Sequence, residues 1–217
     1  LDDNNPTHFE YAGAAGSYSD ANGFTCCRGR IHSNIEKDIG QYDLPKEVFW
    51  ASGACFFIRS KLFWNQNGFD DSFFAHQEEI DLCWRVFNAG FKTMALGASK
   101  VYHVGGATLG TSPRKVFLNH RNSLWMLTKN LPLEKLAWRL FRRLCWDGII
   151  GIYYLFNLKF NSLLAIIKAH YAFYRKFKSI KIKSNTSIKK ENYFYTRNII
   201  LSFIKEKKLI FKDLNIE

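Results

Sequence analysis

Residues 73–85 read FFAHQEEIDLCWR and predict a helix with one buried face and one polar face. Apolar residues recur at the three- and four-residue spacing that places side chains on one side of a helix. Gly90 is a stop signal, so we expect the helix to run from about Glu78 to Asn88. Its core stripe is Ile80, Cys83, Trp84 and Phe87, and its polar face is Glu78, Asp81, Arg85 and Asn88.

The carboxylates Glu78, Glu79 and Asp81 lie in the first turn of this helix. A helix N-terminus favours negative charge, so we expect them to stay ionised. An ionised carboxylate at the edge of a cleft can accept a proton from a hydroxyl nucleophile. The alternative is an acidic capping cluster with a helix pair between Asp81 and Arg85, which helix physics alone favours because acidic first turns are common.

The segments around this helix predict an α/β fold. Residues 1–48 show no sustained period and indicate loops with short strands. The run Phe49–Ser60 is apolar and aromatic, and it predicts a buried strand. We expect two further short strands after the helix, at Phe91–Leu96 and at Lys100–Val104.

Two more groups of candidate residues follow these strands. His103 stands in the segment VYHVGG, where two glycines let a ligand approach closely, and a neutral His is a ready ligand for a divalent metal. The Ser-Pro pair at 112–113 begins a helix that we expect to reach about Lys129. Arg114 and Lys115 lie at its start, where they could hold phosphate oxygens. The alternatives are a structural His and a solvated helix face.

In chain order, the motifs W-A-S-G-A, F-x-x-H-x-E-E-I-D-L-C-W-R, V-Y-H-V-G-G and S-P-R-K-x-x-L-x-x-R-N resemble glycosyltransferase family 2, particularly its bacterial rhamnosyltransferase-like members. The resemblance covers roughly residues 9–130. It implies a GT-A fold, a mixed-sheet α/β domain. It also implies transfer of a sugar from a nucleotide-sugar donor with inversion, with Mg²⁺ or Mn²⁺ neutralising the leaving diphosphate.

The same resemblance implies roles for single residues. Glu79 takes the position of the catalytic base, which is usually Asp in the family, and its extra methylene changes its reach. His103 matches the metal-ligand His, and Arg114 and Lys115 match a region that approaches the diphosphate. The implied acceptor-binding residues are Trp50, Ser52, Gly53, Glu78, Asp81 and Arg85.

The nucleotide-binding half of the family, which ends in a D-x-D motif, is not recognisable in these 217 residues. We therefore expect residues 1–131 to be the acceptor-side half of a GT-A domain. We expect residues 132–217 to be a tail of basic amphipathic helices. A chain of this kind is expected to bind a nucleotide sugar weakly by itself.

Charge supports a distinct role for the tail, because residues 113–217 carry a net charge of +16 while residues 1–112 carry −4, which together give the formal net charge of +12. Basic residues beside apolar ones favour binding to an anionic membrane surface. This would suit a lipid-linked saccharide acceptor and a cytoplasmic protein held on the inner face of the cell membrane. The alternative is a helical pair packed on the catalytic domain. The basic stripe is Lys135, Arg139, Arg142 and Arg143, and further helices are expected at Ser162–Phe177 and Tyr193–Phe211.

Other classes of protein are disfavoured. Five scattered cysteines without a C-x-x-C pair indicate reduced thiols, and no apolar stretch is long enough to span a bilayer. No nucleic-acid-binding motif and no H-E-x-x-H zinc motif is present. The remaining alternative is a non-catalytic membrane-surface module or scaffold. Such a module has no need for Glu79, Asp81 and His103 together.

Overall fold

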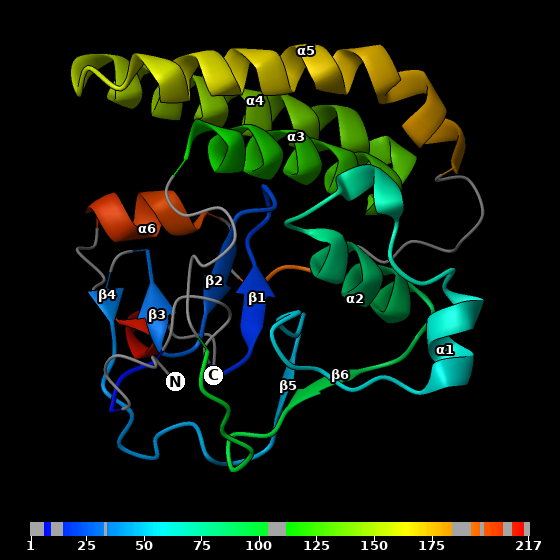
Figure 1. Cartoon of the computed structure of the whole chain (residues 1–217), viewed down its shortest axis with the longest axis vertical. Coiled ribbons are helices and arrows are strands. Elements are labelled where there is room, and N and C mark those ends of the chain that lie inside the picture. The colour runs from blue at the N-terminus through cyan, green and yellow to red at the C-terminus, as the bar shows by residue number, and fades with distance from the viewer. Residues whose placement is uncertain are drawn as a thin grey trace.

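The computed structural model of the chain describes residues 7–9, 15–32, 34–103, 112–183, 192–195, 198–205 and 210–214. Within these ranges the fold is mixed α/β, with two small sheets and six α-helices. The long helices α3 (Pro113–Asn130), α4 (Leu133–Phe156) and α5 (Phe160–Lys183) form a layer along one side of the molecule. Figure 1 shows the strands and shorter helices on the other side of this layer. The α/β class expected from the sequence is confirmed.

The sheets are built from short strands. The first sheet joins β1 (Ser17–Ser19), β2 (Thr25–Cys27), β3 (Arg30–Ile31) and β4 (Asn34–Ile35), antiparallel and in that order. The second pairs β5 (Lys46–Val48) with β6 (Thr93–Ala95), also antiparallel, with Glu47 opposite Met94. A single bridge between Ser17 and Trp50 links the two.

The buried strand predicted at Phe49–Ser60 is wrong. The β5 strand ends at Val48, and after Trp50 the chain leaves the sheet and turns at 53–55. Phe49 and Trp50 are buried, but Phe57 is 95% exposed. The run is apolar without being a strand, since its second half has no strand beside it to pair with.

Of the two strands expected after α2 (Glu78–Asn88), one is confirmed. The strand expected at Phe91–Leu96 is β6, shorter by a few residues. Lys100–Tyr102 are not in a strand, and His103 forms only an isolated bridge. Val104 lies outside the described residues. The strand predicted at Lys100–Val104 is therefore wrong over residues 100–103.

Helix α2 has the bounds that its periodicity predicts. Ile80, Cys83 and Trp84 are buried, as expected for the core stripe. The opposite face is not solvated, because Asp81 is 0% exposed and is covered by α3. Upstream lie α1 (Ser60–Asn65) and the 3₁₀ turn η1 (Asp71–Phe73).

The helical layer is an antiparallel stack. Helix α3 begins as predicted, because the Ser112 hydroxyl accepts the backbone N–H of Lys115 and Pro113 occupies the first turn. Pro132 separates α3 from α4, and a turn at 157–159 reverses the chain into α5, which packs along α3. Helix α5 is longer than the Ser162–Phe177 expected.

The C-terminal segment returns to the sheets. The Tyr193 ring lies 4.4 Å from the Trp84 ring, and its hydroxyl donates to the Ala21 carbonyl at 2.8 Å. Phe211, in η2 (Phe211–Leu214), stacks on Tyr18. One helix over Tyr193–Phe211 was expected and is wrong at its start, because residues 193–195, where Tyr193 packs on Trp84, are not helical; among the described residues of this range the α-helix is α6 (Ile199–Lys205).

Side chains from before and after residue 131 share one hydrophobic cluster, which includes Trp84, Leu136 and Phe211. The domain boundary at residue 131 stays a prediction. Of the helices in the described ranges, none combines the length and apolar character that crossing a bilayer requires.

Candidate functional site

The loop that enters α2 has an unusual backbone. Phe74, His76 and Gln77 have φ values of 67°, 67° and 73°, in the left-handed region that glycine normally occupies. Each such residue costs free energy and persists only where its surroundings hold it. Backbone of this kind often accompanies function, so this loop is the first place to look for a site.

Asn122 of α3 holds this loop. Its side chain is fully buried, and Nδ2 lies 3.0 Å from the Phe73 carbonyl oxygen, 2.8 Å from that of Ala75 and 2.7 Å from that of His76. The neighbouring Arg121 donates from Nη2 to the Phe73 carbonyl at 2.9 Å. Helix α3 therefore fixes the path of the chain into the first turn of α2.

Glu79 lies in that first turn with a desolvated carboxylate. Burial, and then the charge of Glu78, raise the pKa of Glu79 to about 7, against backbone N–H groups that lower it. The Oε2 atoms of Glu78 and Glu79 are buried and find no hydrogen-bond partner among the described residues. Burial thus opposes the ionisation of Glu79 expected at the helix N-terminus, and its effect on the pKa exceeds that of the backbone N–H groups of the first turn.

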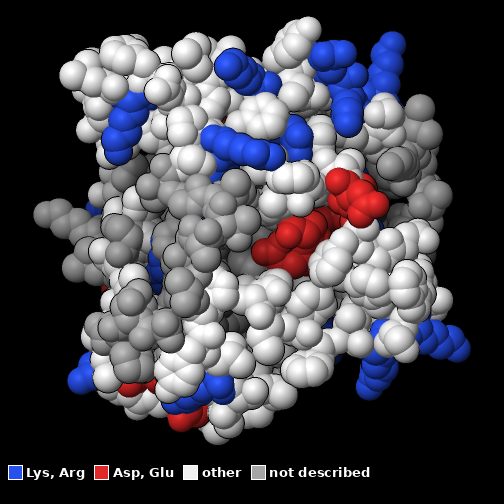
Figure 2. All heavy atoms as spheres, viewed as in Figure 1, with Lys and Arg blue, Asp and Glu red and all other residues white. Residues whose placement is uncertain are grey.

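Several predicted site residues lie near Glu79 or near the loop that precedes it. Gly53 packs on it, since a Cβ built at Gly53 would lie 3.7 Å from the Glu79 Cβ. From α3, the Arg114 guanidinium lies over the Phe74 ring at 5.0 Å. Burial and the nearby charge of Lys115 lower the pKa of His76. Figure 2 shows acidic side chains in a hollow near the N-terminal end of α2, with basic side chains above them over the helical layer.

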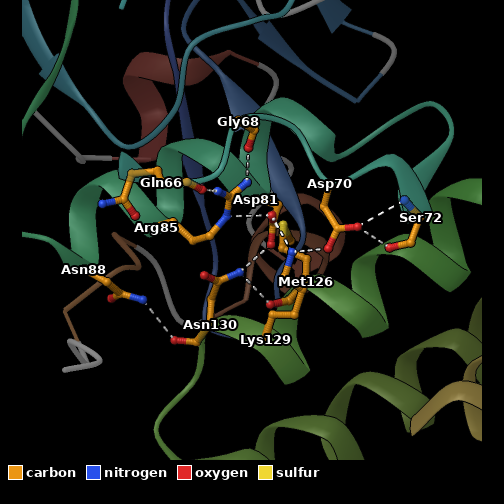
Figure 3. A network of polar contacts seen from close by, with 10 residues as sticks. All are labelled: Gln66, Gly68, Asp70, Ser72, Asp81, Arg85, Asn88, Met126, Lys129 and Asn130. Carbon is orange, nitrogen blue, oxygen red and sulfur yellow. Dashed lines mark hydrogen bonds and ion pairs between the residues drawn. The ribbon is translucent and has the colours of Figure 1, made fainter. Parts of the chain in front are cut away.

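Asp81 and Arg85 belong to a network of polar contacts that links α2 to α3 (Figure 3). Asp81 Oδ2 accepts from Arg85 Nε at 2.9 Å and from Lys129 Nζ at 2.8 Å, and Oδ1 accepts from Asn130 Nδ2 at 2.8 Å. Lys129 also binds Asp70 at 2.7 Å. Burial would raise the pKa of Asp70, but Lys129 and Ser72 outweigh it and hold that pKa below its usual range. The network braces α2 against α3.

The other predicted acceptor residues are placed differently. Trp50 is buried, and its indole Nε1 donates to the Tyr18 carbonyl at 3.2 Å. Ser52 lines a cavity of 690 Å³ that lies between residues 51–59 and the β5–β6 sheet, and Glu79 does not border this cavity. Gly53 and Glu78 are thus the acceptor candidates that lie next to Glu79, and contact of any of the six candidates with an acceptor stays a prediction.

The predicted metal ligand His103 is partly buried. In the part of the chain that the structure describes, no group of three or more His, Cys, Asp or Glu side chains could hold a metal ion. The two glycines of VYHVGG lie outside the described residues. A single imidazole does not make up the ligand set of Mg²⁺ or Mn²⁺, which prefer oxygen ligands.

Sequence reasoning missed Asn122 and His76. Both stand in the motifs quoted above, but neither has a local pattern that reveals its role. Asn122 lies inside an otherwise buried stretch of α3, and a buried polar residue normally has a partner to satisfy. That signal would have marked Asn122 as structurally important without naming the loop it holds.

Replacing Asn122 by Ala is expected to free the loop before α2. The carbonyls of Ala75 and His76 lose their side-chain donor and that of Phe73 keeps Arg121, so the free energy of unfolding should fall by about 1–3 kcal/mol. Urea denaturation and hydrogen exchange at residues 73–77 measure both effects. Asn119→Ala, one turn earlier on α3, is the matched control. Unchanged exchange at 73–77 in Asn122→Ala would show that other contacts hold the loop.

Comparison with known proteins gives partial similarity. Over 81 residues the chain is 28% identical to N-acetylglucosaminyl-diphospho-decaprenol L-rhamnosyltransferase from two strains of Mycobacterium tuberculosis, CDC 1551 / Oshkosh and ATCC 25618 / H37Rv. The match covers 37% of this chain and 26% of the length of each relative. No family model matches the chain, and no solved structure matches it.

Proposed function

We propose that this chain is the acceptor-side part of an inverting glycosyltransferase with a GT-A fold. It would transfer a hexosyl-type sugar from a nucleotide-sugar donor to a lipid-linked saccharide in cell-surface polysaccharide synthesis. The observation that carries this is Glu79, a half-buried residue whose Oε2 has no hydrogen-bond partner among the described residues, next to Gly53 and to a loop held in a strained backbone, with a pKa raised by burial to about 7. Similarity to relatives named for a lipid-diphosphate acceptor supports the same reading.

The residues suggest a direct displacement. The Glu79 carboxylate accepts the proton of an acceptor hydroxyl, and that oxygen forms a bond to the anomeric carbon as the bond to the nucleoside diphosphate breaks. Arg114 and Lys115, beside the same loop, would meet the negative charge of the leaving diphosphate. A divalent metal remains part of the proposal with His103 as one candidate ligand, and no step above depends on it.

A transfer assay tests the proposal. Nucleotide sugars are incubated with a polyprenyl-diphosphate-linked saccharide and the protein, and the product is identified by mass spectrometry, with its anomeric configuration from NMR. The match spans 26% of the length of each relative, so the assay is made both with this chain and with the protein encoded by the whole open reading frame that contains it. Absence of transfer by both would sink the proposal and favour the non-catalytic membrane module.

Transfer should depend on pH through Glu79. Only the deprotonated carboxylate accepts a proton, so below the pKa of about 7 the rate should rise about tenfold per pH unit and then level off above it. Glu78→Gln removes the charge that helps to raise this pKa and should move the midpoint to lower pH. Glu47→Gln, on the distant β5 strand, should leave the midpoint where it is. If the midpoint of the pH profile is the same in Glu78→Gln as in the parent, the titrating group is not Glu79.

A further inference from the structure

The turn between α4 and α5 ends the helical layer in a group of exposed apolar side chains. Phe156 is 82% exposed and Leu158 is 75% exposed. Lys159 is the one charged residue between Asp147 and Lys168. We call this end of the hairpin the apolar tip, and its exposed large apolar members are Ile149, Ile152, Tyr153, Leu155, Phe156, Leu158, Phe160, Leu164 and Ile167. A contiguous exposed patch of this kind usually marks a binding surface.

Leu158 provides a second, independent observation. Its φ is 56°, in the left-handed region, where a Leu is disfavoured and Gly or Asn fits better. Its side chain is exposed, so little burial within the chain offsets this strain. The turn itself requires this conformation, because the Lys159 N–H donates to the Tyr154 carbonyl and closes the end of α4; what the fold does not explain is an exposed Leu side chain at a position where Gly or Asn fits better.

Two residues of the basic stripe, in contrast, make contacts within the protein, while Lys135 is exposed. Arg143 is buried, and its Nε lies 2.9 Å from Asp147 Oδ1. The Arg139 guanidinium lies over the Phe194 ring at 5.0 Å. The sequence-based expectation that this stripe faces lipid is therefore wrong for Arg143, and the lipid-facing surface must be sought elsewhere on these helices.

The apolar tip fits a lipid bilayer better than a flat protein partner. Its exposed residues come from both helices and from the turn itself, so it is a protruding end and not a single face. Basic and tyrosine side chains follow it along α5, where Lys168, Tyr171, Tyr174 and Arg175 are exposed. Tyrosines and basic residues beside an apolar end are typical of segments that sit in the headgroup region. The net charge of +12 adds attraction to anionic lipid.

The helical stack fixes which end of the site faces that membrane. His120 of α3 lies 2.9 Å from Asp147 of α4, and Asp147 lies 3.0 Å from His170 of α5. Because the three helices alternate in direction, the start of α3 and the apolar tip lie at the same end of the layer. Arg114 and Lys115 are therefore at the end that carries the tip.

We propose that the apolar tip inserts into the headgroup–acyl boundary of an anionic phospholipid membrane. This insertion would bring the Arg114 and Lys115 end of the site to the level of lipid headgroups. Insertion itself stands on the exposed residues and does not depend on catalysis. Its use, which is to meet the diphosphate of a lipid-linked acceptor, rests on the proposed function.

Co-sedimentation of the whole chain with phosphatidylglycerol/phosphatidylcholine vesicles tests the insertion. The variant Phe156→Ser/Leu158→Asn removes the two most exposed apolar side chains of the tip, and Asn relieves the strain at 158, so folding should be kept. The partition coefficient of this variant into the vesicles should fall by at least about tenfold, because two apolar side chains that would be buried in the membrane are removed. Ile39→Ser/Leu44→Ser, which changes two exposed apolar residues elsewhere, is the control and should bind like the parent.

Three outcomes would overturn the proposal. If the tip variant and the control variant lose vesicle binding equally, exposed apolar residues anywhere on the protein bind the vesicles. If the tip variant binds as well as the parent and both lose binding at high salt, the binding is purely electrostatic. Dimers of the parent without vesicles, abolished in the tip variant, would assign the tip to a second copy of the chain. Co-sedimentation does not measure sugar transfer. The insertion proposal can therefore fail while the proposed function holds, and the proposed function can fail while insertion holds.

Discussion

Replacing Asp147 by Asn is expected to lower the free energy of unfolding by about 3–5 kcal/mol, the cost of leaving a buried charge without its partner. Asp147 is 0% exposed and lies within 2.9 Å of Arg143 Nε and of His120 Nδ1. Without the carboxylate, the buried Arg143 would have no acidic hydrogen-bond partner among the described residues and would keep its Nη1 contacts to the carbonyls of Asn22 and Gly23 and its position over the Phe24 ring. The cluster joins all three helices of the layer to the turn after β1.

Urea denaturation of Asp147→Asn and of the exposed control Asp71→Asn measures this effect. The control should stay within about 0.5 kcal/mol of the parent. Burial would raise the pKa of Asp147, but Arg143, His120 and His170 outweigh it and hold that pKa below its ordinary value. The stability from this group is therefore present above the pKa of an unfolded Asp and is lost as pH falls. A loss under about 1 kcal/mol would mean that water or repacking compensates Arg143.

The parts of the fold that the sequence predicted are those with local signals. Helix α2 follows from its apolar period, and α3 follows from its Ser-Pro start. Strand pairing is not local: β5 and β6 are separated by two helices, and nothing in Phe49–Ser60 tells a strand from an exposed apolar loop. Tyr193 likewise packs on Trp84 across a long stretch of sequence, which no helical period predicts.

The site shows the same limit at the level of single residues. A helical period separates apolar from polar positions, so it placed Asp81 on the polar face of the helix. It could not show that Lys129 and Asn130 of α3 meet that face with matching polar groups. For Glu79, the helix N-terminus contributes about 0.3–1 kcal/mol, less than one pKa unit. Burial can shift a pKa by several units, and burial is not readable from the first turn of a helix.

Replacing Glu79 by Gln is expected to remove the proton acceptor while keeping the shape of the side chain. If Glu79 is the base, transfer should fall by about 10²–10⁴-fold in kcat. The free energy of unfolding should not fall at pH 8, because a buried carboxylate without a hydrogen-bond partner at Oε2 and beside Glu78 is replaced by a neutral amide. A purely structural role would move stability and activity together.

Glu79→Asp completes the comparison, since it keeps the base and shortens its reach by one methylene. It should retain more transfer than Glu79→Gln, with a pH profile that still rises toward a plateau. The three proteins are compared in the polyprenyl-diphosphate saccharide assay and by urea denaturation at the same pH. If Glu79→Gln transfers sugar as fast as the parent, the base lies elsewhere. In that case we would assign the strained loop, which Asn122 holds, and the paired glutamates to acceptor binding and not to proton transfer.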